Sequence, residues 1–153
     1  MKDGDILKIY LDDSALHRLL DDRRLPEVKY ERELMVMIVE LIEKEAIDCV
    51  GSEVLNKQIK ATENVFKETI LEVLYSMTKD EVKVNRDILE RAEEIRRKFG
   101  DVLYTDSLHI ACAEVGEADV FVTVDEKLVK ASKGIKLKTR LMTLPRFLME
   151  VLK

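Results

Sequence analysis

The sequence predicts an α/β fold in which a mainly parallel β-sheet carries helices on its faces. Short apolar segments recur along the chain and alternate with helical patterns, which is the order expected when helices connect parallel strands. The chain has only two prolines and five glycines among 153 residues, which favours long regular elements joined by short turns. Its length, without repeats or flexible linkers, indicates a single domain covering residues 1–153.

Five short segments are predicted to be the strands of this sheet. Residues 6–11 ("ILKIYL") and 46–50 ("AIDCV") are apolar and partly β-branched, which is typical of buried strands. Residues 80–85 ("DEVKVN") alternate between polar and apolar side chains, which indicates a strand near an edge. The remaining strands are expected at 119–124 ("DVFVTV") and 135–139 ("IKLKT").

Helices are predicted between these strands, because apolar residues recur there three or four positions apart. Ser52 and Asn85 are suitable N-cap residues, and Gly100 suits the end of a helix. The expected helical segments are residues 15–22, 30–46, 51–61, 63–78, 86–100, 105–115, 125–132 and 144–152.

Charge and composition narrow the classes of function. The formal net charge is −5, whereas a protein built to coat nucleic acid is usually basic. The N-terminal "MKDGDILKIYL" has no long apolar run, and no stretch approaches a membrane span, so we expect a soluble cytoplasmic protein without a membrane partner. Cys49 and Cys112 are expected to be buried free thiols of a reducing compartment.

Acidic residues follow several of the predicted strands. In open α/β sheets, ligands bind outside the carboxyl ends of the strands. Asp12 follows the first strand, Glu53 the second and Asp125 the fourth, while Asp106 opens the helix that leads into the fourth strand. We therefore expect at least three of these carboxylates to converge, although 31 acidic residues in the chain make chance placement common.

Converging carboxylates point to a bound cation. Their mutual repulsion raises their pKa values unless a cation neutralises them. A hard divalent ion such as Mg²⁺ or Mn²⁺ takes oxygen ligands and keeps positions open for phosphate and water. Because such ions polarise phosphoryl oxygens and activate water, the pattern predicts metal-assisted hydrolysis of phosphodiesters.

The motifs of this chain resemble those of the PIN domain family, in its VapC-like branch. The resemblance covers nearly the whole chain, and it is carried by "IYLDDSALHRLLDD", "VGSEVLNKQI", "YTDSLHIACAEVGEADVFVTVDEKLVKAS" and "LPRFLMEV". It implies a three-layer α/β/α sandwich with a central, mainly parallel sheet. It also implies a ribonuclease that uses Mg²⁺ or Mn²⁺, with RNA as substrate and, in toxin–antitoxin pairs, an antitoxin as partner. A homodimer is expected from the family and from the apolar helix at 34–42.

The resemblance assigns roles to five residues. The family's acids match Asp12, Asp106 and Asp125, which would hold the metal ion. Its hydroxyl residues match Ser14 in the first motif and Thr123 in the "T-x-D" of the fourth strand. These two side chains would orient the carboxylates.

One position departs from the family pattern. The family's second acid lies six residues after Ser52, where this chain has Gln58. Gln58 offers a metal ion a neutral oxygen but no charge, and Glu53 lies about 140° away in helical projection, so that it is at most a helper. The departure leaves a second hypothesis open, in which the chain is a weakened or inactive PIN-fold protein that serves binding or assembly.

Several side chains keep two interpretations. Arg18 matches the family's opening motif and would either contact phosphate or pair with Asp21 or Asp22. Asp106 would cap its helix, bind metal, or do both. His109 would face the site or, as the commoner case, pack internally with a bond to the backbone. The lysines of the last third form either a basic rim for RNA or a solvated face; they are Lys127, Lys130, Lys133, Lys136 and Lys138.

Overall fold

A five-stranded parallel sheet forms the centre of the computed structural model, which describes residues 6–21, 24–100 and 102–151. The strand order is β3-β2-β1-β4-β5, and every neighbouring pair is parallel. The strands are β1 (Leu7–Leu11), β2 (Ile47–Ser52), β3 (Asp80–Val82), β4 (Val120–Thr123) and β5 (Arg140–Thr143). The predicted parallel sheet is confirmed, with β3 at one edge as the alternating pattern indicated.

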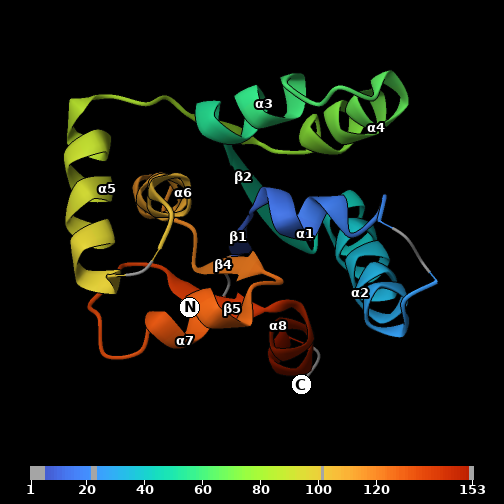
Figure 1. Ribbon diagram of the computed structural model, residues 1–153. Coiled ribbons are helices and arrows are strands. Elements are labelled where there is room, and N and C mark those ends of the chain that lie inside the picture. The colour runs from blue at the N-terminus through green and yellow to red at the C-terminus, as the bar shows by residue number, and fades with distance from the viewer. Residues whose placement is uncertain (1–5, 22–23, 101, 152–153) are drawn as a thin grey trace.

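Helices cover both faces of the sheet and give the predicted three-layer α/β/α arrangement (Figure 1). One hydrophobic cluster takes side chains from α1, α2, α3, α4 and α8, and the other takes them from α5, α6 and α7. The helices are α1 (Asp13–His17), α2 (Pro26–Glu43), α3 (Glu53–Lys60), α4 (Val65–Tyr75), α5 (Arg86–Phe99), α6 (Tyr104–Val115), α7 (Glu126–Ala131) and α8 (Leu144–Val151).

Successive side chains of the central strands alternate between the two layers. Ile9 and Leu11 of β1 lie in the cluster with α2, whereas Tyr10 lies in the cluster with α6. This alternation is the period-2 pattern of a strand that is buried on both faces. The two cysteines are buried and free, as expected.

The predicted caps Ser52, Asn85 and Gly100 are confirmed, and several helices differ from their predicted extent. Ser52 accepts a hydrogen bond from the Leu55 N–H at 3.1 Å, and Asn85 caps α5 in the same way. Gly100 ends α5 with φ +78°, a conformation that suits glycine. The α2 helix begins at Pro26, earlier than predicted, because proline fits the first helical position. The α1 helix (Asp13–His17) is shorter than the predicted 15–22, of which residue 22 lies outside the described residues. Within the described residues, none of the helices combines the length and apolarity needed to span a membrane.

The last strand lies later in the chain than predicted. We expected it at 135–139, but β5 is Arg140–Thr143, and its first N–H donates to the Asp119 carbonyl oxygen at 3.2 Å. The "IKLKT" pattern suggested a strand because it alternates. In the structure, the backbone of this segment bonds to side chains of another layer instead of to the sheet.

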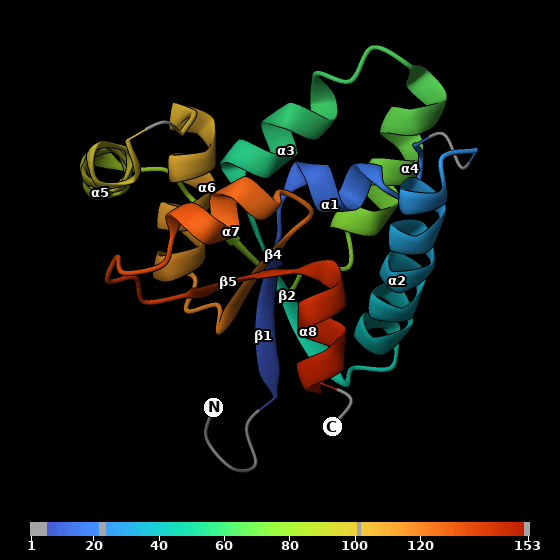
Figure 2. The same ribbon diagram turned by 60° about the horizontal axis from the view of Figure 1, so that its bottom comes forward.

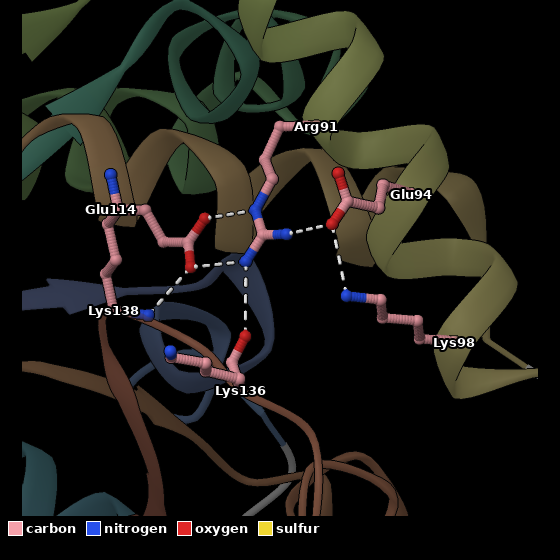
Figure 3. Close-up of polar contacts among 6 residues, drawn as sticks. All are labelled: Arg91, Glu94, Lys98, Glu114, Lys136 and Lys138. Atoms are coloured by element: carbon pink, nitrogen blue, oxygen red, sulfur yellow. Dashed lines mark hydrogen bonds and ion pairs between the residues drawn. The ribbon is translucent and has the colours of Figure 1, made fainter.

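Arg91 and Glu114 form the ion pair that holds this segment (Figure 3). The Arg91 guanidinium donates from Nε to Glu114 Oε1 at 2.7 Å and from Nη2 to Oε2 at 3.0 Å. Arg91 Nη2 also donates to the Lys136 carbonyl oxygen at 3.3 Å, and Glu114 Oε2 accepts from the Lys138 N–H at 2.8 Å. The Glu114 carboxylate raises the pKa of Arg91. The pair therefore ties α5 and α6 to the segment before β5.

The order of the strands creates a crevice at the centre of the sheet. The chain runs outward from β1 through β2 to β3, and then returns to the other side of β1 for β4 and β5. The direction in which successive strands are added to the sheet therefore reverses between β1 and β4. At such a switch point, the connections that leave the carboxyl ends diverge and leave room for a ligand. The carboxyl ends of β1 and β4 lead into Asp12 and Asp125.

Candidate active site

Asp12 lies at the carboxyl end of β1, caps α1, and is buried with only 3% of its surface exposed. Its Oδ1 accepts hydrogen bonds from the Ala15 N–H at 2.9 Å and the Ser14 hydroxyl at 2.7 Å. Its Oδ2 accepts from the Thr123 hydroxyl at 2.6 Å. Burial raises the pKa of Asp12 from its ordinary 3.8 to about 6, and these hydrogen bonds only partly oppose the rise.

Thr123 connects the ends of the two central strands. Its side chain is fully buried at the end of β4, and its Oγ1 both donates to Asp12 and accepts from the Asp125 N–H at 3.1 Å. The Ser14 hydroxyl lies 3.3 Å from Thr123 Oγ1. Residues from β1, α1 and β4 thus meet around one carboxylate, which is the orienting arrangement that the sequence suggested for Ser14 and Thr123.

Asp106 and Asp125 lie close enough to interact through their charges. Burial raises the pKa of Asp106, and the negative charges of Asp125 and Asp13 raise it further. Asp125 caps α7, where its Oδ1 accepts from the N–H groups of Lys127 and Leu128 at 3.0 and 3.1 Å. The capping interpretation of Asp106 is wrong, because α6 begins one residue after Leu103 and has no side-chain cap. Helix capping therefore does not explain Asp106.

Asp13 belongs to the same group of acids, although the family motif assigns no role to it. It is the first residue of α1, and its negative charge contributes to the raised pKa values of Asp12 and Asp106. Its Oδ1 lies 4.0 Å from Nε2 of His109. The signal was present in "LDDS", where Asp13 directly follows the acid of the family motif. The interpretation overlooked it because a second acid at a strand end is usually exposed to solvent.

Gln58 lies at the partly buried end of a chain of hydrogen bonds. His109 is fully buried, with Nε2 2.7 Å from Gln58 Oε1 and Nδ1 2.6 Å from the Tyr10 hydroxyl, which lies 2.7 Å from Ser52 Oγ. The internal packing expected as the commoner case for His109 is confirmed, but its partners are side chains and not the backbone. Burial lowers the pKa of His109 to about 4, so the imidazole is neutral at pH 7.

The direction of each hydrogen bond in this chain follows from the groups involved. An amide oxygen only accepts, so His109 Nε2 carries the proton and donates to Gln58. In a neutral imidazole the other nitrogen then accepts, here from the Tyr10 hydroxyl. The Gln58 oxygen is consequently bound by His109, and its amide N–H groups remain available as donors.

Glu53 and Arg18 make structural contacts. Glu53 Oε1 accepts from the Val84 N–H at 2.7 Å and so fixes the chain after β3. Arg18 donates from Nε to Glu31 and from Nη1 to Asp21, both at 2.8 Å. The ion-pair interpretation of Arg18 therefore holds, with Asp21 as expected and with Glu31 as a second carboxylate.

The chemistry of the acids fits a hard divalent ion. Aspartate oxygens are the ligands that Mg²⁺ and Mn²⁺ prefer. The raised pKa values of Asp12 and Asp106 indicate buried negative charge, which a cation would relieve. As the side chains stand, however, no three His, Cys, Asp or Glu residues in the described part of the chain are arranged to hold a metal ion.

Comparisons with solved structures identify similar folds in three organisms. VapBC2 from Rickettsia felis, bound to a DNA fragment from its promoter, matches with TM-score 0.56 and 12% identity over 90% of this chain and 98% of that one. PAE2754 from Pyrobaculum aerophilum matches with TM-score 0.55 and 14% identity over 97% and 98%. FitAcB from Neisseria gonorrhoeae matches with TM-score 0.56 and 14% identity over 89% and 97%. At these identities, the likeness shows the fold.

The family itself is identified by sequence. The search of curated proteins found no match to this sequence. The model of the PIN domain matches residues 9–134, which is most of the chain and includes the acids described above. PIN domains are generally nucleases, which supports a hydrolase in broad terms. The chain belongs to the PIN domain family.

Proposed function

We propose that this protein is a ribonuclease that depends on a divalent metal ion and hydrolyses phosphodiester bonds of RNA. The observation that carries the proposal is the state of Asp12. Its carboxylate is buried at the switch point of the sheet, both oxygens are oriented by neutral donors, and no ion pair with a described residue balances its charge. A carboxylate in that state is suited to a cation that arrives with, or before, a phosphate substrate.

Asp12, Asp106 and Asp125 are the residues that would hold Mg²⁺ or Mn²⁺. When bound, the ion polarises a phosphoryl oxygen and stabilises the charge that develops on the phosphate. Ser14 and Thr123 keep the Asp12 carboxylate in one orientation, since each donates to a different oxygen of it. The helix cap made by Asp125 fixes that residue relative to β4.

In the proposed nuclease, Gln58 would donate hydrogen bonds to the substrate and would not be a metal ligand. Its oxygen accepts from His109, so its amide N–H groups are the part left to bind another group. A phosphate oxygen is a suitable acceptor for them. Asp13, which lies near His109 and influences Asp106, supplies the additional negative charge that position 58 lacks.

The experiment that tests the function is cleavage of single-stranded RNA with and without Mn²⁺. Asp12→Asn should abolish cleavage while the protein stays folded, because the amide removes the charge that attracts the cation. Asp87→Asn is a matched control in an exposed helical turn, and it should cleave like the unchanged protein. Equal cleavage by Asp12→Asn would refute the assignment.

The second candidate is an inactive PIN-fold binding or assembly protein, and the bound oxygen of Gln58 is the observation that favours it. Calorimetric titration with Mn²⁺ separates the two functions. Binding that is lost in Asp12→Asn supports the nuclease. No binding at millimolar Mn²⁺ supports the inactive protein.

We also propose a place for the protein in a toxin–antitoxin pair, acting on cytoplasmic RNA. The VapC-like motifs and the PIN family support a partner antitoxin. Expression of the unchanged chain in a bacterial host should arrest growth, and Asp12→Asn should not. For the expected homodimer, Met35, Ile38 and Ile42 of α2 are buried in the chain's own core, which leaves Met37 and Tyr30 as exposed apolar residues of that helix.

The proposed domain covers residues 1–153, beyond the end of the family match at 134. The part of the chain after this point contains β5, which completes the sheet next to β4. It also contains α8, whose Phe147 and Leu148 are buried in the same hydrophobic cluster as Met35. Removal of α8 should therefore unfold the protein.

A further inference from the structure

A groove runs along the outer edge of β5. In the described sheet, β5 is the last strand beyond β4, and it lies between α7 on one face and α8 on the other (Figure 2). A cavity of about 710 Å³ lies against it, lined by β5 itself, by α7, by Arg146 of α8 and by the residues of the segment 132–139 other than Gly134 and Lys136. Its volume lies within the range of pockets that hold a ligand, roughly 300–1,000 Å³.

The floor of the groove offers backbone hydrogen-bonding groups. The Arg140 N–H donates toward the β4 side, to the Asp119 carbonyl oxygen. Because peptide groups alternate in direction along a strand, the N–H groups of Leu141 and Thr143 point to the outer side. An edge strand with such groups is a template for the addition of another extended chain.

The charged side chains of the groove are mostly basic, although the whole chain is acidic with a net charge of −5. The basic residues that line it are Lys130, Lys133, Lys138, Arg140 and Arg146, and the acidic ones are Asp119 and Glu126. Within the described residues, Lys130 and Lys133 are exposed and form no ion pair. The groove is therefore suited to a negatively charged partner.

The groove also has apolar and polar positions for side chains of a partner. Val129, Ile135 and Leu137 line it and provide apolar surface. Thr139 lines it as well, and its buried Oγ1 has no hydrogen-bond partner among the described residues. None of the described lining residues is aromatic. Single-stranded nucleic acids usually bind where aromatic rings stack with their bases, so the lining favours a peptide over RNA.

We propose that the β5 edge binds an extended acidic segment of a partner protein, which adds to the sheet as a further parallel or antiparallel strand. The outward N–H groups of Leu141 and Thr143 would pair with its backbone, and Lys130 and Lys133 with its carboxylates. A second copy of this chain does not fit, because its β5 edge carries the same positive charges. The proposal does not depend on nuclease activity.

The test uses the full chain and a short fluorescein-labelled peptide of alternating glutamate and valine. Fluorescence anisotropy should show saturable binding, and hydrogen exchange should show protection of the Leu141 and Thr143 amide protons in the complex. The same peptide with N-methylated amides keeps its charges but cannot extend a sheet, so it should not bind. Equal binding of the methylated peptide would overturn the proposal.

A pair of double variants with the same change in charge tests the surface. Lys130→Glu with Lys133→Glu should weaken binding of the peptide by roughly tenfold or more, because both lysines line the groove. Lys127→Glu with Lys136→Glu changes exposed lysines outside the lining and should leave binding within about twofold. Equal losses in the two double variants would contradict the proposal.

Competition with unlabelled oligouridylate distinguishes a protein partner from RNA. The peptide should remain bound at RNA concentrations that saturate the protein. Displacement of the peptide, together with weaker RNA binding in the Lys130→Glu and Lys133→Glu variant, would assign the groove to RNA and overturn the proposal.

Discussion

Two buried carboxylates of this protein have opposite surroundings. Glu114, 7% exposed, meets the Arg91 guanidinium through two hydrogen bonds and also accepts from the Lys138 N–H. Asp12, 3% exposed, accepts only from neutral donors. Burial therefore raises the pKa of Asp12 to about 6, whereas the charge of Glu114 is balanced within the fold.

We infer from this difference that Glu114 is a structural charge and that Asp12 is a candidate to bind a cation. A buried charge that is paired internally supports the fold as long as its partner is present. A buried charge that is oriented but unpaired destabilises the fold at neutral pH and is expected where a cation or substrate supplies the missing partner. Removing the charge that pairs with Glu114 should therefore lower the free energy of unfolding, and removing the charge of Asp12 should raise it.

The largest expected effect comes from removal of the Arg91 charge. Arg91→Met would leave the Glu114 carboxylate buried without its cation, which costs about 3–5 kcal/mol of unfolding free energy. Urea unfolding of the two proteins measures the loss. Arg86→Met, which removes an arginine with 91% of its side chain exposed, is the control and should unfold like the unchanged protein. If Arg91→Met is as stable as Arg86→Met, the pair does not hold the fold.

The opposite effect is expected at Asp12. Because its folded pKa lies above the ordinary value of 3.8, the folded state binds more protons than the unfolded state between pH 4 and 6. The protonated Asp12 side chain contributes roughly 2–3 kcal/mol to the free energy of unfolding below about pH 4. This contribution is lost as the pH rises to about 6.

Asp12→Asn should therefore be more stable than the unchanged protein above pH 6 in the presence of EDTA, while it loses cleavage. Unfolding free energies of both proteins at pH 4 and pH 7.5 measure the difference. A variant that is less stable at pH 7.5 and equally stable at pH 4 would show that the charge of Asp12 is balanced within the chain.

A smaller effect is expected when the family's acid is restored. In Gln58→Glu, the new carboxylate accepts from His109 Nε2 and should raise the pKa of His109 from about 4 toward neutrality. Because His109 binds the new oxygen, RNA cleavage should gain little. A proton NMR titration of the imidazole gives the pKa, and Gln58→Leu is the uncharged control. A large gain in cleavage without a change in this pKa would show that the new acid reaches the metal ion instead.

The smallest effect is expected at the rim of the paired region. Lys98 contacts Glu94 at 3.1 Å, and Glu94 contacts Arg91 at 2.7 Å (Figure 3). Lys98 and Glu94 are about half exposed, so solvent screens the interaction. Lys98→Ala should leave the urea midpoint unchanged within error. A clear loss would extend the structural network beyond the Arg91–Glu114 pair.

Local sequence patterns predicted the parallel sheet, the caps Ser52 and Asn85, and the positions of acids after the strands. These features depend on which residues follow one another within a few positions. The patterns failed at 135–139, where contacts with Arg91 and Glu114 override an alternating pattern. They also missed the bond between Gln58 and His109, which are 51 positions apart and meet only after folding. No local pattern reports such a contact.

The position of Thr123 has a consequence for the evolution of this family, because one side chain contacts two of the acids. One hydroxyl group aligns the acid of the first strand and the backbone of the acid after the fourth. Its replacement by valine would keep the volume of the side chain and every negative charge, and yet release both alignments. If the proposed nuclease site is correct, a relative with this valine would be inactive although all its acids are intact, and its carboxylates alone would not identify it as active or inactive.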